Sequence, residues 1–239
     1  MPEREGKLDR ISETYKSDQG LELLLLEADI DVILGRLSGK RILELGCANG
    51  VMTRVLAEQS LKIDVVEGSA NYISYVRDLV GERVTFYHAL FEDFEPEHLY
   101  DDIILASVLE HVEDPVGLVR NASNWLEPRG RIHVVVPNAM SLHRRLGVEI
   151  GVLSDVTELT ESDMSIGHQR VYTQETLDRD LAAASLVILE RRGILLKPLS
   201  NAQMDSWPSY VLDELFLAGE LVPDWAAHIY RLCGTSVPS

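Results

Sequence analysis

Short apolar segments alternate with longer amphipathic ones through the first half of this chain. From residue 41 onward, runs typical of buried strands alternate with segments whose apolar residues recur at helical spacing. The predicted strands cover residues 41–45, 62–67, 84–88, 102–107 and 131–137, and the predicted helices cover 51–59, 71–80 and 115–126. This alternation predicts a parallel sheet with helices on both faces, because a crossover helix returns the chain between parallel strands.

The segments on either side of this core are less regular. Residues 1–20 are polar and predict irregular or partly helical structure, and residues 21–37 predict a helix that leads into the first strand. After Pro137 the alternation stops, and residues 138–170 contain an arginine pair, an apolar stretch and an acidic run. A long excursion after the carboxyl end of a strand is typical of a cap or binding loop, and a solvated surface loop is the alternative.

The last part of the chain returns to alternating elements, with helices at 173–184 and 210–218 and strands at 186–189 and 229–233. We therefore expect one domain over residues 1–239. Its expected parts are an N-terminal helical segment (1–37), a core (38–137), an inserted cap (138–170) and a C-terminal part of the sheet (171–239).

Charge and cysteine content narrow the range of partners. The 22 Lys and Arg residues against 39 Asp and Glu residues give a net charge of −17, which disfavours nucleic acid as a partner because phosphate binding relies on basic residues. Cys47 and Cys233 lie far apart and offer neither a disulfide framework nor zinc-ligand spacing. We expect a cytoplasmic protein without a metal or a membrane anchor, since the longest early aliphatic run covers only residues 23–26.

A glycine turn follows the first predicted strand and opens the next helix, reading Glu44-Leu45-Gly46-Cys47-Ala48-Asn49-Gly50. A dinucleotide fingerprint needs glycines at the third and sixth positions from Gly46, where this chain has Ala48 and Val51, and the phosphate-loop lysine is also missing. Glu44 beside the turn would repel a pyrophosphate and attract a cation. The turn therefore favours a phosphate-free nucleoside.

The second predicted strand ends in Glu67, 17 residues beyond Gly50. A carboxylate at the tip of the strand that follows a nucleotide-type turn can accept hydrogen bonds from both ribose hydroxyls. Glu67 is thus a second, independent indication of a ribose.

These features together resemble the class I S-adenosylmethionine-dependent methyltransferases, and in particular their small-molecule branch, which includes the ubiquinone-biosynthesis type. The resemblance rests on residues 42–50, on Glu67, on residues 100–115 with Leu109-Glu110-His111, and on residues 125–131, and it covers residues 38–137. The fourth strand continues as Ser107-Val108-Leu109 instead of the Asn/Asp-Pro-Pro-Tyr/Phe signature of enzymes that methylate base amines or protein glutamine, which favours a small-molecule acceptor.

The resemblance implies a Rossmann-like, doubly wound α/β fold with a seven-stranded sheet, mostly parallel with an antiparallel last strand. It implies S-adenosylmethionine as cofactor and S-adenosylhomocysteine as product. We expect a monomer or a homodimer, although no motif supports a homodimer. Glu44 and the turn would hold the methionine part, Glu67 with Gly68 the ribose, and Leu90 and Phe91 the adenine. Glu92 would take the place of an adenine-binding Asp that this chain lacks. Ser107 and Val108 would lie beneath the methionine part, and His111 would border the pocket. Tyr15 would either close over the methyl group or have only a packing role. The cofactor-binding set is therefore Tyr15, Glu44, Gly46, Cys47, Ala48, Asn49, Gly50, Glu67, Gly68, Leu90, Phe91, Glu92, Ser107, Val108 and His111.

The histidines are the candidates for proton transfer. His111 is interpreted as a catalytic base or as a wall residue, and His168 as a base or an acceptor-binding residue. Arg170 either anchors an anionic substrate or, with Tyr172, fastens the cap to the sheet. His143 and Asn201 are weaker candidates for substrate binding. His88, His98 and His228 are interpreted as ordinary strand or surface residues.

The predicted reaction is methyl transfer to an oxygen or nitrogen of a small molecule. A base is needed only if the acceptor still holds its proton at neutral pH. Two alternatives stay open: transfer of another group from the same cofactor, such as the aminocarboxypropyl chain, and a cofactor-binding partner protein without chemistry.

Overall fold

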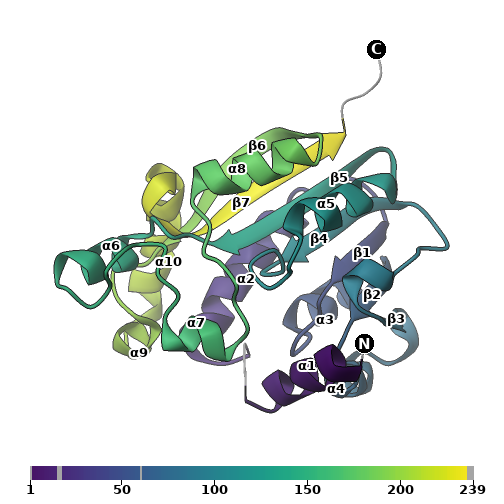
Figure 1. Ribbon diagram of the computed structural model, residues 1–239, viewed down its shortest axis with the longest axis horizontal. Helices are drawn as coiled ribbons and strands as arrows, with labels where there is room; N and C mark the ends of the chain where they lie inside the picture. The colour runs from purple at the N-terminus through teal and green to yellow at the C-terminus, as the bar shows by residue number, and fades with distance from the viewer. Residues whose placement is uncertain (1, 15–17, 60, 236–239) are drawn as a thin grey trace.

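The computed structural model describes residues 2–14, 18–59 and 61–235 (Figure 1). Seven strands form one sheet: β1 (Arg41–Leu45), β2 (Lys62–Glu67), β3 (Val84–His88), β4 (Tyr100–Ala106), β5 (Leu126–Pro137), β6 (Leu186–Leu196) and β7 (Ala226–Thr235). The α-helices are α1 (Pro2–Thr14), α2 (Gly20–Leu34), α3 (Val51–Glu58), α4 (Ala70–Val80), α5 (Pro115–Asn124), α6 (Leu142–Glu149), α7 (Glu161–Ser165), α8 (Gln174–Ala183), α9 (Asn201–Met204) and α10 (Ser209–Leu221). Short 3₁₀ turns cover Gly81–Arg83, Phe91–Asp93 and Pro223–Trp225.

The strands are ordered β3-β2-β1-β4-β5-β7-β6. The pairs from β3 to β5 are parallel, and β7 is antiparallel to both of its neighbours. The predicted seven-stranded sheet with an antiparallel last strand is therefore confirmed. The chain moves outward from β1 to β3 and then returns to the other side of β1 with β4, and α/β folds bind ligands at such a reversal, at the carboxyl ends of the strands.

Alternating side chains of the strands pack against two helical layers. Ile42, Ile63 and Val65 belong to a core that includes residues of α2, α3 and α4. Leu43 and Ile103 point to the other face, where the core includes residues of α5 and α8. Strands buried on both faces are expected where helices cover both faces, and this explains their nearly continuous apolar sequences.

Strand β6 is longer than its sequence pattern predicts, since it extends to Leu196 instead of ending near residue 189. The polar stretch in its middle belongs to an edge strand with a solvent-facing side. There, Glu190 pairs with Arg36 at 2.8 Å and Arg192 pairs with Glu220 at 2.5 Å. Hydrogen bonding to β7 extends the strand through residues that the apolar pattern does not mark.

The N-terminal segment forms a helix, α1, that packs against α4. The Ser69 hydroxyl at the start of α4 donates a hydrogen bond of 2.6 Å to the Asp9 carboxylate. Because Ser69 follows the second strand by two residues, this contact brings α1 beside the carboxyl edge of the sheet (Figure 1). Across the described ranges, no helix has both the length and the apolar character that crossing a bilayer requires.

Gly50, which precedes α3, combines a left-handed backbone with close packing. Its φ is 75°, and a Cβ there would lie 2.6 Å from Val76 Cγ1, whereas Gly151 also has φ of 75° but nothing within 4 Å of its Cβ position. We expect Gly50→Ala to lower the free energy of unfolding by about 2–4 kcal/mol and Gly151→Ala by about 1 kcal/mol, measured by urea denaturation. Equal losses would contradict the packing role of Gly50.

Candidate active site

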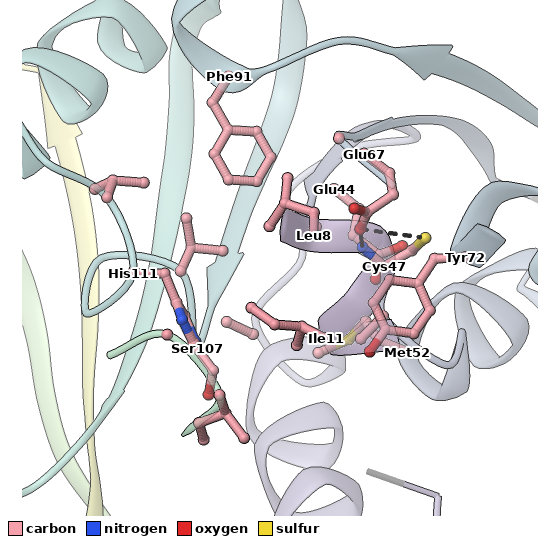
Figure 2. A pocket seen from close by; sticks show the side chains of 18 of the residues that line it. Leu8, Ile11, Glu44, Cys47, Met52, Glu67, Tyr72, Phe91, Ser107 and His111 are labelled. Atoms are coloured by element: carbon pink, nitrogen blue, oxygen red, sulfur yellow. Dashed lines mark hydrogen bonds between the residues drawn. The ribbon is translucent and has the colours of Figure 1, made fainter. Parts of the chain in front are cut away.

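A cavity of about 320 Å³ opens at the carboxyl edge of the sheet, where the strand order reverses. Figure 2 shows side chains from several elements pointing into it, among them Phe91, Ser107 and His111. Most of the residues predicted to hold the cofactor line this cavity: Glu44, Gly46, Cys47, Ala48, Glu67, Gly68, Leu90, Phe91, Glu92, Ser107, Val108 and His111. Asn49 and Gly50 are not among the lining residues, and Tyr15 lies outside the described residues.

The Glu67 carboxylate ties the glycine turn to the end of β2. It accepts a hydrogen bond from the Cys47 backbone N–H at 3.1 Å and another from the Ser69 N–H at 2.8 Å. Burial raises the pKa of Glu67 above its ordinary value, and the backbone donors work against that rise. The Cys47 thiol also donates to Oε2 at 3.8 Å, so the remaining acceptor site for a ribose hydroxyl is on Oε1, which accepts from Ser69.

Glu44 lies at the base of the glycine turn with 3% of its surface exposed. The Thr53 hydroxyl donates a hydrogen bond of 2.8 Å to its carboxylate. Burial raises the pKa of Glu44 to about 8, and the nearby charge of Glu67 contributes to the rise. A positively charged ligand beside Glu44 would favour the ionised form, so this end of the cavity suits a cation.

The wall of the cavity that faces the glycine turn is apolar. Phe91, just after β3, points into the cavity (Figure 2). A Cβ on Gly46 would lie 3.5 Å from Phe91 Cζ and 3.6 Å from Val108 Cγ2, so the turn and the apolar wall approach each other closely.

Helix α1 supplies two apolar lining residues that the sequence pattern does not single out, Leu8 and Ile11 (Figure 2). Leu8 packs onto Gly68, where an added Cβ would lie 2.5 Å from its Cδ1, and Ile11 packs beside Gly167. Their spacing of three residues is a helical signal, but it stands alone in a polar segment and does not indicate a ligand site.

The cavity continues past the predicted cofactor residues toward β7. The predicted cofactor residues lie at the ends of β1 to β4, whereas Glu22 and Asp29 of α2 and His228 of β7 line the part that remains. His228 Nδ1 lies 2.9 Å from Asp29 Oδ2. His228 is a strand residue of β7, in agreement with one part of its interpretation, but its side chain is largely buried and lines the cavity, so it is not a surface residue. The two partners are 199 positions apart, and no local pattern could reveal their pairing.

His111 and His168 come together beside the cavity, with ring centroids 4.6 Å apart. His111 lines the cavity, whereas His168 is not among the lining residues and its Nδ1 lies 3.4 Å from Asp163. Burial lowers the pKa of His111 to about 4, and the neighbouring His168 contributes to this fall. A histidine this weakly basic is neutral at pH 7 and suits a wall role better than proton capture.

Glu110 completes this cluster. Both of its carboxylate oxygens are buried and have no hydrogen-bond partner among the residues that the structure describes, and burial raises its pKa to about 7. Ligand atoms of Glu110, His111 and His168 all lie within 4.8 Å of one another, and they are of types that bind divalent cations. Sequence spacing could not show this cluster because its members come from two distant segments. The expectation of no metal stays a prediction.

Arg170 and Tyr172 fasten the end of the cap segment to the body of the protein. The Arg170 guanidinium donates to the backbone carbonyls of Leu109 and Val112 at 2.8 and 2.5 Å. Tyr172 is 2% exposed and its hydroxyl donates to Asp180 at 3.3 Å. Neither residue lines the cavity. The geometry therefore supports a role in fastening the predicted cap over a role in anchoring an anionic substrate. The cap residues that do line the cavity are Ile166, Gly167 and Gln169.

His143 and Asn201 lie behind the cavity wall. The Asn201 side-chain amide donates a hydrogen bond of 2.8 Å to Glu22, which lines the cavity. His143 is not a lining residue, and burial lowers its pKa to about 3. Their assignment to substrate binding stays a prediction.

Comparison with known proteins identifies the family. A family model described as a methyltransferase domain matches residues 19–191, and the chain belongs to this family, the class I S-adenosylmethionine-dependent methyltransferases. A ubiquinone biosynthesis O-methyltransferase from Rickettsia conorii is 25% identical over 184 residues, which are 74% of this chain and 62% of that protein. This chain therefore matches less than two thirds of that relative's length.

Two solved structures show the same fold. The N-methyltransferase NodS from Bradyrhizobium japonicum, in complex with S-adenosylhomocysteine, aligns with a TM-score of 0.54 and 17% identity over 90% of this chain and 85% of that chain. The [4+2]-cyclase SpnF aligns with a TM-score of 0.58 and 16% identity over 98% of this chain and 93% of that chain. At these identities the likeness concerns the fold alone, and the two names show that one fold hosts different reactions.

Removal of the Glu67 carboxylate tests its assignment to the ribose. We expect Glu67→Ala to weaken the binding of S-adenosylhomocysteine by about 1–3 kcal/mol, because hydrogen-bond acceptors for the ligand and for the turn are both lost. Isothermal titration calorimetry measures the change, with Glu97→Ala as a control at an exposed carboxylate. Unchanged affinity in Glu67→Ala would contradict the assignment.

The unpartnered Glu110 carboxylate predicts a dependence of stability on pH. Its pKa rises from 4.5 to about 7 on folding, so the folded protein holds this proton to higher pH and stability falls as pH rises between these values. Glu110→Gln removes this loss of stability at higher pH. We expect the stability of the variant relative to the wild type to increase by about 2–3 kcal/mol between about pH 5 and about pH 8.

Urea denaturation at the two pH values measures this difference. A relative stability that does not change with pH would show that folding does not raise the pKa of Glu110.

Proposed function

We propose that this protein binds S-adenosylmethionine in the cavity and transfers its methyl group to an oxygen or nitrogen atom of a small-molecule acceptor. The observation that carries the proposal is the joint placement of Glu67 and the glycine turn in a cavity that extends past β4 toward β7. The end of the cavity at β1 to β3 has the groups that a nucleoside needs. The end toward β7 has room and polar groups for a second molecule.

The residues of the cofactor end fit this molecule. Glu44 and Glu67 offer negative charge to a ligand that carries a sulfonium and an amino group, and the turn brings backbone close to it. Among the described lining residues Lys7 alone is a lysine or arginine, so a dinucleotide pyrophosphate would find little compensation here. The apolar wall at Leu90 and Phe91 suits an adenine ring.

The protein's own contribution is alignment and exclusion of water. When bound, the cofactor supplies an activated methyl group on a sulfonium whose leaving group is a neutral thioether. Glu67 and the turn would orient the adenosine, Ser107 and Val108 would support the methionine side, and α1 with the cap end would cover the cavity. Correct alignment in an enclosed site contributes strongly to the rate of such a displacement.

Two alternatives predict different results. Transfer of the aminocarboxypropyl group would use the same cofactor, and a protein that binds the cofactor without chemistry would give no product. The cyclase among the structures with this fold keeps both alternatives open, since the fold does not determine the reaction.

The experiment that tests the proposal has two parts. Calorimetry should show binding of S-adenosylhomocysteine but not of a nicotinamide dinucleotide. Incubation with S-adenosylmethionine and a panel of phenols, sugar alcohols and amines should then give a product heavier by one methylene, detected by mass spectrometry.

A mass increase that corresponds to an aminocarboxypropyl group would support the first alternative, and binding without any product would support the second. We expect the methyl transfer rate to be unchanged by EDTA. A loss of rate that Mg²⁺ restores would show that the cluster of Glu110, His111 and His168 holds a metal.

A further inference from the structure

The wall at the β7 end of the cavity contains a buried carboxylate–imidazole pair. Asp29 comes from α2 and His228 from the start of β7, and both line the cavity. Nδ1 of His228 lies 3.0 Å from Asp29 Oδ1 and 2.9 Å from Oδ2. Asp29 is 1% exposed, so this pairing is shielded from solvent.

The pairing determines which nitrogen of His228 is available. A carboxylate only accepts hydrogen bonds, so Nδ1 carries the proton and donates it to Asp29. Burial raises the pKa of Asp29, and the charge and hydrogen bond of His228 oppose that rise. In the neutral form of the His228 ring, Nε2 then has the lone pair, and within the described part of the chain no group forms a hydrogen bond with it. A carboxylate that holds Nδ1–H in this way fixes the tautomer and stabilises the imidazolium that forms when Nε2 takes up a proton.

The charged groups around His228 act in opposite directions. Burial lowers the pKa of His228, but Asp29 and Glu22, both on α2, raise it, and the net result is a pKa above the ordinary value. Lys197, just after β6, works against this rise. Glu110 after β4 and His143 of α6 also interact electrostatically with His228.

The other histidines near the cavity lack this combination. His111 lines the cavity but has a pKa lowered to about 4 and no carboxylate hydrogen-bonded to its ring. His168 is next to Asp163 but does not line the cavity. Of these three histidines, only His228 has both a carboxylate partner and a place in the wall.

We propose that His228, held by Asp29, is the general base for a hydroxyl-bearing acceptor bound at the β7 end of the cavity. This inference rests on the proposed function. The acceptor oxygen forms its new bond to the methyl carbon while the carbon–sulfur bond breaks and its electron pair stays on sulfur. The acceptor proton passes to Nε2 and gives an imidazolium paired with Asp29.

A hydroxyl fits this end of the cavity better than the other acceptor types. A carboxylate acceptor would meet Asp29 and Glu22, which carry the same charge, and it needs no base. A free amine also needs no base during the transfer. A positioned base is required where the acceptor atom still carries its proton at neutral pH, as in a phenol or alcohol.

The test follows the ionisation of 4-nitrophenol, a chromophoric phenol, bound to the protein saturated with S-adenosylhomocysteine. Absorbance of the phenolate is recorded as a function of pH. We expect the apparent pKa of the bound phenol to fall by about one unit, which is about a tenfold larger ratio of phenolate to phenol at a given pH, because the ion pair of phenolate and imidazolium is favoured.

Variants separate His228 from its surroundings. His228→Gln should abolish the fall in the phenol pKa and Asp29→Asn should reduce it, whereas the exposed control His98→Gln should behave as the wild type. A purely structural role of the Asp29–His228 pair would lower the melting temperature of the variants and leave the phenol ionisation of the folded variants as in the wild type, which would overturn the proposal.

The direction in which the wild-type protein shifts the pKa of the bound phenol decides the proposal even if His228→Gln does not fold. If the pair were not a base, the carboxylates Asp29 and Glu22 would raise the phenol pKa or leave it unchanged, and either result would overturn the proposal. The titration is repeated without S-adenosylhomocysteine. A protein that fails to bind this ligand would refute the proposed function, and the phenol titration would still show whether His228 takes up the proton.

Discussion

The Glu67 carboxylate is the contact on which the cofactor end of the site depends. It receives backbone N–H groups from both sides, from the turn after β1 and from the start of α4, and so holds two loops of neighbouring strands together. A buried carboxylate is costly unless donors surround it, and here the donors are parts of the binding loops themselves. The group that would bind a ribose is therefore also the group that shapes the loops around it.

The strand order explains why two molecules can meet at this edge. The residues predicted to hold the nucleoside lie at the ends of β1, β2 and β3 on one side of the reversal, and the remaining wall lies toward β7 on the other. Ser107 and His111 follow β4 and line the cavity, and β4 lies between β1 and the β5–β7 side of the sheet.

The fold could be predicted in large part because its signals are local. Alternating apolar runs located five of the seven strands within about three residues. Strand β5 begins at Leu126 instead of residue 131, and β6 was underestimated because Glu190, Arg191 and Arg192 mask an edge strand. The joint placement of Glu44, the glycine turn and Glu67 in one cavity could also be predicted, since they occupy a short stretch at the ends of two neighbouring strands. The β7 end of the cavity could not be predicted, because Asp29 and His228 come together only through the tertiary fold. No periodicity or motif in the sequence marks either residue.

The measurement that tests the central claim most directly is a crystal structure of the complex with S-adenosylhomocysteine. We predict both ribose hydroxyls within about 2.5–3.0 Å of the Glu67 carboxylate, with the thioether sulfur directed toward the part of the cavity bounded by Asp29 and His228. A ligand whose ribose makes no contact with Glu67, or whose sulfur points away from that part of the cavity, would contradict this assignment of the two ends.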